Sequence, residues 1–232
     1  MPAPHSITIL CGHYGCGKTN LALNLALTAA QSPGPVTLCD LDIVNPYFRS
    51  SEYKALLVQQ GVRVIAPVFA GTTLDTPTLP PELASIFSPQ SGRVFLDAGG
   101  DDVGATALGG LAGRLAEMGY EMLYIVNRYR ALSQSPEEAA ALLKEIEAAS
   151  RLRATGIVNN SHLGAETTLA CLEEAQGFAQ ETARLTGLPL LCSTVPDFAL
   201  KGQAAPEGFR TIRRIVRFAW EPPFTGPPAG FP

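Results

Sequence analysis

Apolar residues fall into short continuous runs separated by longer segments with helical periodicity. Most runs are apolar throughout rather than alternating, which is typical of parallel strands buried on both faces. They predict strands at 6–11, 36–40, 62–66, 93–97, 122–127, 154–159 and 189–195. The intervening segments predict helices at 18–30, 50–60, 104–118, 136–149, 167–185 and 209–218. This alternation predicts an α/β fold with a doubly wound, mostly parallel sheet and helices on both faces.

Turn-forming residues refine these boundaries. Ser135 precedes Pro136 and two glutamates, which predicts a helix start with a cap residue and acidic side chains at the positive end of the dipole. Segment 71–92 is rich in Thr, Pro and Ser and is expected to be a loop with one short helix near 82–86. Residues 221–232 contain five prolines. We therefore expect one domain over 1–220 and a polyproline-like tail over 221–232.

Composition narrows the function classes. The 232 residues carry a net charge of −4, which argues against general nucleic-acid binding. No signal peptide or membrane-length apolar run is present, and five cysteines without a CxxC pair indicate free thiols. These features predict a cytoplasmic protein. The four arginines in 209–218 are expected to form the solvated face of a last helix, although a basic helix can also touch nucleic acid or acidic lipid.

One motif carries the strongest chemical signal, because it matches G-x-x-x-x-G-K-[ST] in full and lies between an apolar strand and a helix. Glycines allow backbone N–H groups to converge on phosphate oxygens, and the helix dipole adds positive potential. Lys18 is expected to bind the β and γ phosphates, and Thr19 to bind Mg²⁺. The predicted phosphate-binding residues are Gly12, His13, Tyr14, Gly15, Cys16, Gly17, Lys18, Thr19 and Asn20.

Acidic residues follow two predicted strands, at the sheet edge where ligands bind in this architecture. Asp40 and Asp42 follow the second strand, and we expect one to hold Mg²⁺ and the other to activate water. Asp97 ends the fourth strand as a Walker B aspartate would, and the N–H of Gly100 is placed to meet the γ-phosphate. Asp101 is expected to cap the next helix.

These motifs together resemble the CobQ/CobB/MinD/ParA group of P-loop proteins, and the stretches GHYGCGKT and DLDIVNPYFRS resemble a bacterial branch of it. The resemblance extends from the first strand to about residue 197. It implies an ATP- and Mg²⁺-dependent switch that hydrolyses nucleotide slowly. By position it places Thr19, Asp40 and Asp97 at the metal and gives Lys18 and Asp42 the catalytic roles.

The resemblance also indicates where the base binds. Asn159 or Asn160, at the end of the sixth strand, is expected to recognise adenine, while the other is a turn residue. Pro196 lies in a segment similar to the one that lines the base. The sequence contains no Asn-Lys-x-Asp guanine signature, so we expect ATP rather than GTP.

One position departs from the pattern. Many members of this group carry a second lysine after the first P-loop glycine, which reaches the partner's nucleotide in an ATP-dependent homodimer; here His13 occupies it. Such a homodimer would be weaker or completed by another cation, and Arg49, Arg128 and Arg130 are the candidates.

Three function classes remain open from the sequence. The first is an ATPase switch that an unknown protein partner reads. The second is an ATP-dependent ligase or kinase of related architecture, acting on a small molecule. The third is a scaffold that holds nucleotide without turnover, which the full acidic set disfavours.

Overall fold

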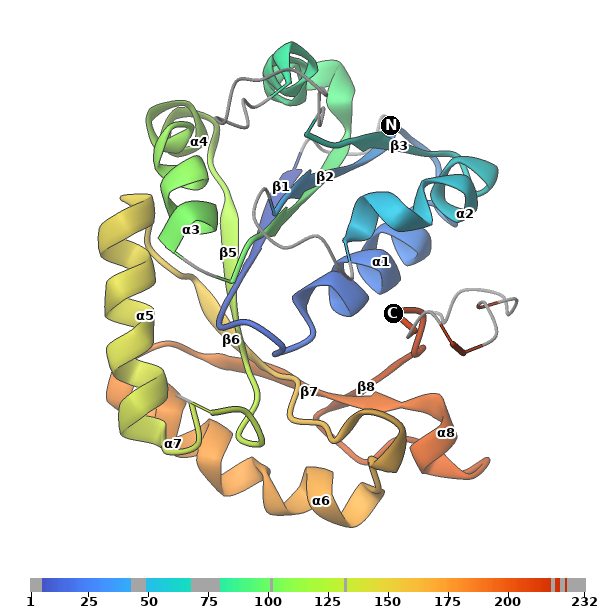
Figure 1. Cartoon of the computed structure of the whole chain (residues 1–232), viewed down its shortest axis with the longest axis vertical. Coiled ribbons are helices and arrows are strands. Elements are labelled where there is room, and N and C mark those ends of the chain that lie inside the picture. The colour runs from blue at the N-terminus through green and yellow to red at the C-terminus, as the bar shows by residue number, and fades with distance from the viewer. Residues whose placement is uncertain are drawn as a thin grey trace.

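The computed structural model describes residues 6–42, 49–67, 80–100, 102–131, 133–217, 220–221 and 224. Its centre is one eight-stranded sheet in the order β3-β2-β4-β1-β5-β6-β7-β8, and all neighbouring strands run parallel (Figure 1). The strands are β1 (Ser6–Cys11), β2 (Val36–Leu41), β3 (Val62–Ile65), β4 (Arg93–Ala98), β5 (Glu121–Val126), β6 (Gly156–Asn159), β7 (Leu190–Pro196) and β8 (Phe209–Ile212). The predicted α/β fold class is confirmed.

Helices connect the strands. The α-helices are α1 (Lys18–Ala29), α2 (Lys54–Gln59), α3 (Asp102–Gly109), α4 (Ala112–Met118), α5 (Pro136–Ser150), α6 (Leu169–Glu174), α7 (Gln176–Thr186) and α8 (Asp197–Leu200). Short 3₁₀ helices are η1 (Ser50–Tyr53), η2 (Pro81–Phe87), η3 (Pro89–Ser91) and η4 (Gly164–Glu166). The predicted start of α5 is confirmed, because Ser135 accepts a hydrogen bond from the Glu138 N–H at 3.2 Å.

Helices cover both faces of the sheet, so the core has two halves (Figure 1). Alternate residues of β1 point to opposite faces, as the period of two in a strand requires. Ile9 packs in the half that includes α3, α4, α5 and α7, whereas Leu10 packs in the half that includes α1 and α2. Strand β1 is therefore buried on both faces, which explains its continuously apolar sequence.

The prediction of a last helix over 209–218 is wrong. Residues 209–212 form β8, which pairs with β7, and residues 213–217 continue without helix; we call residues 213–217 the strap. The segment is rich in β-branched residues, which favour strands. Ile212 and Ile215 are buried in the same half of the core as α1. Burial and pairing with β7 therefore override the helical spacing of the arginines.

Other boundaries shift less. The predicted helix over 104–118 is interrupted at residues 110–111, next to two consecutive glycines, and the one over 167–185 divides into α6 and α7. The short helix expected near 82–86 is present as η2. Segment 68–79 and Asp101 lie outside the described residues, as does most of the tail 221–232.

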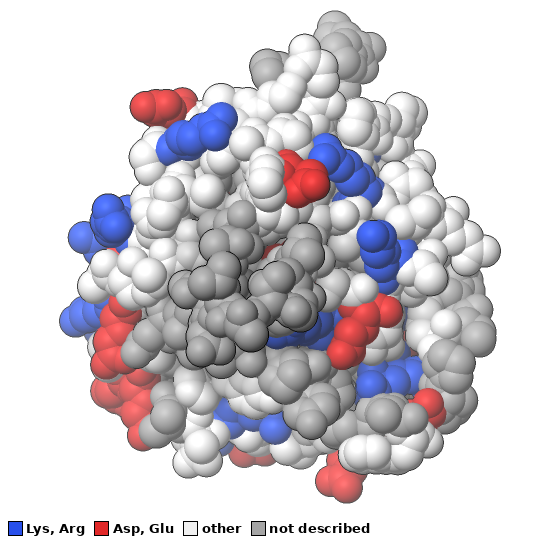
Figure 2. Space-filling view, turned by 45° about the horizontal axis from the view of Figure 1, so that its top comes forward, with Lys and Arg blue, Asp and Glu red and all other residues white. Residues whose placement is uncertain are grey.

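The surface shows no single charged face in the view of Figure 2, where positive and negative side chains are interspersed. All five cysteines are free thiols. Within the described ranges, no helix is both long enough and apolar enough to cross a membrane.

Candidate functional site

The predicted phosphate-binding loop lies between β1 and α1, at the carboxyl edge of the sheet. Gly17 precedes α1 with φ of +86°, a left-handed conformation that favours glycine. A Cβ there would also lie 2.3 Å from Asn160 Nδ2, whose N–H donates to the Cys16 carbonyl at 2.7 Å. The end of β6 therefore buttresses the loop, and only glycine fits at the contact.

Lys18 is folded back over the loop. Its Nζ donates hydrogen bonds to the carbonyls of Gly12 at 3.0 Å and His13 at 3.1 Å, and the side chain is buried. Gly100 lies directly against the same place, because a Cβ there would be 2.6 Å from Tyr14 N and 2.9 Å from Lys18 Nζ. The structure thus brings Gly100, predicted to serve the γ-phosphate, together with the lysine predicted to bind it.

Two of the predicted acids form a buried pair. Asp40 and Asp97 are register partners on the adjacent strands β2 and β4, and each is only 1% exposed. Asp40 is well satisfied, since its two carboxyl oxygens accept hydrogen bonds from the N–H groups of Asp42 and Ser51, both at 3.1 Å. Burial raises the pKa of Asp40, and the hydrogen bonds from Ser51 oppose this shift.

Asp97 lacks such partners. In the described part of the chain, neither of its buried oxygens makes a hydrogen bond of normal geometry, and the nearby hydroxyl of Ser50 is also unsatisfied. Burial, followed by the charge of Asp40, raises the pKa of Asp97 to about 7. The charge of Lys18 and the hydroxyls of Thr19 and Ser50 act in the opposite direction. A buried carboxylate without a partner is costly, so this position fits a cation.

The oxygen donors around Asp97 suit Mg²⁺, which prefers hard oxygen ligands and keeps several waters or phosphate oxygens in its shell. Thr19 and Asp97 supply the hydroxyl and carboxylate, with Asp40 alongside. No group of three or more His, Cys, Asp or Glu side chains in the described ranges forms a self-sufficient metal site. An ion here would therefore depend on phosphate oxygens, as in other P-loop sites.

A cavity of about 320 Å³ extends from this loop across the carboxyl edge of the sheet, and we call it the P-loop cavity. One end is lined by the loop itself, including Lys18 and Thr19, together with Asp42, which is half-buried. Residues at or after the ends of β6, β7 and β8 complete the lining, and Asn160 and His162 among them adjoin Gly17 of the loop. Residues 43–48, which follow Asp42, lie outside the described residues.

The two candidate adenine residues occupy different environments. Asn159 is buried within the sheet, donates to Ser193 Oγ at 3.1 Å and accepts from Ser161 Oγ at 2.7 Å; it does not line the P-loop cavity. Asn160 does line the cavity. Its amide oxygen accepts a hydrogen bond from Thr194, which orients the side chain toward the loop. Asn160, rather than Asn159, is thus positioned to meet a ligand.

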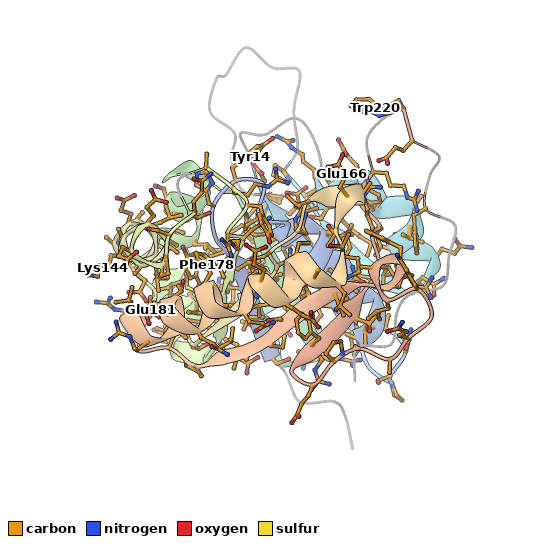
Figure 3. All side chains as sticks on the ribbon, turned by 90° about the horizontal axis from the view of Figure 1, so that it is seen from below. Tyr14, Lys144, Glu166, Phe178, Glu181 and Trp220 are labelled. Carbon is orange, nitrogen blue, oxygen red and sulfur yellow. The ribbon has the colours of Figure 1, made fainter. Side chains whose placement is uncertain are left out.

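The remaining predicted loop residues differ in exposure. Tyr14 is 52% exposed and lies on the same side of the molecule as Glu166 and Trp220, away from Glu181 on α7 (Figure 3). His13 is half-buried, with Nδ1 3.1 Å from the Tyr14 carbonyl. Cys16 is buried, and burial raises the pKa of its thiol, so it contributes packing rather than a thiolate.

The three candidate arginines lie in different places and have different partners. Arg130 lines the P-loop cavity and donates from Nε to the Gly15 carbonyl at 2.9 Å. Arg128 instead pairs with Glu174 at 3.4 Å, and Arg49 is buried near Asp40. Of the three, only Arg130 lies at the phosphate-binding loop within the described structure.

Sequence reasoning missed several cavity residues: His162, Phe198, Arg214 and Arg217. His162 follows β6, and its pKa is lowered to about 4 by burial and by the charges of Arg130 and Arg214, so it is neutral at pH 7. The two arginines belong to the strap. The spacing of the arginines in 209–218 predicts a solvated helix, so the sequence does not place Arg214 and Arg217 at the cavity. The β-branched residues of the segment are the signal that favours a strand.

The fold and this edge define a class. A parallel sheet with a glycine-rich loop between β1 and α1, facing aspartates at the ends of two neighbouring strands, is the P-loop nucleotide-binding fold of the SIMIBI class. MinD and ParA proteins belong to the same broad class.

Solved structures share this fold. The signal recognition particle 54 kDa protein from Aeropyrum pernix, in complex with GDP, has a TM-score of 0.55 and 16% identity over 83% of this chain and 42% of its own. FtsY from Thermotoga maritima gives 0.57 and 18%, over 84% of this chain and 63% of its own. FtsY from Elizabethkingia anophelis, also with GDP, gives 0.52 and 15%, over 84% and 58%. The chain thus spans about half of these proteins' lengths. No family model and no curated protein matches it.

Proposed function

We propose that this protein binds ATP with Mg²⁺ and hydrolyses it slowly, so that the nucleotide state acts as a switch. The observation that carries the proposal is the buried carboxylate of Asp97, which makes no hydrogen bond of normal geometry within the described residues and lies beside Thr19 and Lys18 at the glycine-rich loop. A Mg²⁺ ion bound with phosphate would supply the positive charge that balances this carboxylate.

Each residue then has a defined role. Backbone N–H groups of the loop and Lys18 would bind the phosphates, with Gly100, which lies against Tyr14 and Lys18, next to the γ-phosphate. Thr19 and Asp97 would hold the metal, with Asp40 alongside. Asp42, which lines the same end of the cavity, orients and deprotonates the attacking water. We call this the phosphate end of the P-loop cavity.

The part of the cavity lined by residues at or after the ends of β6, β7 and β8 takes the base, and we call it the base end. Guanine recognition commonly uses a carboxylate that accepts from both N–H groups of the ring edge. Among the described lining residues at the base end there is no Asp or Glu, whereas Asn160 offers an amide. The solved structures of the same fold include complexes with GDP. We nevertheless favour ATP, because the Asn160 amide keeps a second N–H and a second oxygen lone pair for the adenine edge, beyond its bonds to Cys16 and Thr194.

Titration calorimetry with Mg–ATP and Mg–GTP, followed by phosphate-release assays, tests the function. Lys18→Ala should lower ATP affinity roughly hundredfold, since it removes a charged partner of the phosphates. Lys54→Ala, which removes an exposed lysine of α2, is the matched control. Unchanged affinity in Lys18→Ala would contradict the site. ADP formation only with a small-molecule acceptor would support the ligase or kinase alternative, since a ligase then releases phosphate whereas a kinase transfers it to the acceptor.

Assembly is part of the same proposal. Resemblance to MinD and ParA proteins suggests an ATP-dependent homodimer, and Arg130 is the cation best placed to replace the missing lysine. Light scattering of the ATP-loaded Asp42→Ala protein should show more dimer than the ADP form. Arg130→Glu should abolish that difference, whereas Arg128→Glu should retain it. Identical monomer masses in both nucleotide states would contradict the dimer.

A further inference from the structure

Two side chains at the base end have no assigned role. Phe198 is a large apolar residue that is 40% exposed, and Arg214 is a cation; both line the P-loop cavity. They come from parallel strands whose last paired residues are Pro196 and Ile212. Each follows its paired residue by two positions. Phe198 lies in α8 directly after β7, and Arg214 lies in the strap directly after β8, so register-paired strand ends lead to an aromatic residue and a cation that line the same cavity.

The strap that carries Arg214 is held firmly to α1. Asn24 accepts from the Arg213 N–H at 2.8 Å and donates to the Arg213 carbonyl at 2.9 Å. Asn20 donates to the same carbonyl at 2.9 Å and accepts from the Ile215 N–H at 2.8 Å. These bonds flank Arg214 on both sides. Its backbone is consequently positioned by the helix that begins at the phosphate-binding loop.

Two ion pairs orient arginine side chains of the strap. Arg214 makes a bidentate pair with Glu221, with Nη–Oε distances of 2.8 and 2.7 Å, and both side chains are only 21% exposed. A fork-to-fork pair fixes the guanidinium plane and balances its charge, and it uses the N–H edge of the group rather than its flat face. The neighbouring Arg213 pairs with Asp197 at 3.5 Å, which links the strap to the segment that carries Phe198.

We propose that Phe198 and Arg214 form a clamp that stacks on the two faces of the nucleobase, with Glu221 as the positioning residue of Arg214. The proposal rests on the nucleotide-binding function above. A charge-balanced guanidinium group suits a neutral aromatic ring better than it suits a phosphate. The clamp also explains why an aromatic side chain is left exposed at the rim of a cavity that is otherwise polar at its phosphate end.

The test compares ATP with inorganic tripolyphosphate, which has no base, by calorimetry in the presence of Mg²⁺. Phe198→Ala and Arg214→Gln should each weaken ATP roughly tenfold and leave tripolyphosphate within about twofold. Glu221→Gln should weaken ATP less, again without affecting tripolyphosphate. Phe198→Tyr should restore most of the ATP affinity. Leu163→Ala, an exposed apolar residue outside the cavity lining, and Arg210→Gln on the exposed face of β8 are the controls.

A spectroscopic measurement provides a second readout. In a Trp220→Phe background, Phe198→Trp places the single tryptophan in the clamp, and ATP but not tripolyphosphate should quench its fluorescence. ATP affinity within twofold of wild type in both clamp variants, or equal losses for the two ligands, would overturn the clamp while leaving the phosphate end intact. A wild-type protein that binds neither ligand would overturn the clamp and the proposed function together.

Discussion

The two ends of the P-loop cavity are built by different means. The phosphate end comes mainly from one continuous stretch, residues 12–19, and from Asp42 after β2. Asp97 and Gly100, at and after the end of β4, lie next to Lys18 of this stretch, and both strands are on one side of β1. The base end combines residues that follow β6, β7 and β8 on the other side of β1. A local motif therefore specifies the first end, whereas the second exists only when distant strands pair.

This difference matters for specificity. The phosphate end contains groups that any nucleoside triphosphate can use, such as Lys18 and the backbone of the loop. In the proposed binding mode, selectivity between bases would depend on residues that share no local motif, including Asn160 and the strap. Variants that are expected to affect one end of the cavity and not the other test whether the two ends act independently.

The largest effect is expected for Asp42→Ala. Because Asp42 is proposed to act on water rather than on the nucleotide, ATP hydrolysis should fall roughly hundredfold or more while ATP affinity stays near wild type. Single-turnover phosphate release together with calorimetry measures both quantities. Glu52→Ala, on the exposed surface of η1, serves as the control. Hydrolysis at the wild-type rate would remove Asp42 from the mechanism.

Gly100→Ala comes next. The added methyl group would lie 2.6 Å from Tyr14 N and 2.9 Å from Lys18 Nζ, so the loop or the lysine must move. We expect affinity for both ATP and tripolyphosphate to fall roughly hundredfold, which corresponds to about 3 kcal/mol of lost contact and added strain. Gly113→Ala in α4, where a Cβ meets no atom within 4 Å, should leave both affinities unchanged. Retained tripolyphosphate binding by Gly100→Ala would show that this glycine does not face the phosphates.

A smaller effect is expected for the pH dependence of ATP affinity, which follows the ionisation of Asp97. With a pKa of about 7, the ionised fraction rises roughly tenfold between pH 6 and pH 8, so Mg²⁺-dependent ATP affinity should rise by a similar factor. Asp97→Asn should bind Mg–ATP weakly at both pH values. Glu121→Gln, which alters an exposed carboxyl at the start of β5, should keep the wild-type profile.

Stability without ligand should show the opposite trend. The pKa of Asp97 is raised on folding from 3.8, so its contribution is fully present below that value and is lost as the pH rises toward 7. Asp97→Asn should therefore raise the melting temperature of the ligand-free protein at pH 8 more than at pH 5. Equal shifts at the two pH values would contradict the raised pKa.

The smallest effect is expected for Asn24→Ala, which should weaken the attachment of the strap to α1. It removes the bonds to the Arg213 backbone and should lower the free energy of unfolding by about 1–3 kcal/mol. ATP affinity should fall several-fold, while tripolyphosphate affinity should not change. Gln59→Ala, at the exposed end of α2, is the control. Equal loss for both ligands would mean that Asn24 supports the phosphate end instead.

The same contrast explains what could be predicted from the sequence. The strand pattern and the loop around Lys18 are local, so β1, the P-loop and α1 were predicted close to their observed positions. The base end was harder. The arginines of 209–218 have helical spacing, and only pairing with β7 turns the segment into β8 and the strap. Asn159 and Asn160 are adjacent in sequence, so the sequence alone does not show which of them faces the cavity. Their hydrogen-bond partners in the structure, Ser193 for Asn159 and the Cys16 carbonyl for Asn160, distinguish them.

The link between α1 and the strap has a consequence for biosynthesis. Asn20 and Asn24 contact residues that are 189 to 196 positions further along the chain. During translation the glycine-rich loop and its helix emerge before the strap, so α1 lacks these hydrogen bonds until the strap has left the ribosome. Contacts of such high sequence separation require a large loop to close, which slows their formation. The proposed base end should therefore form only after β8 and the strap have been synthesised.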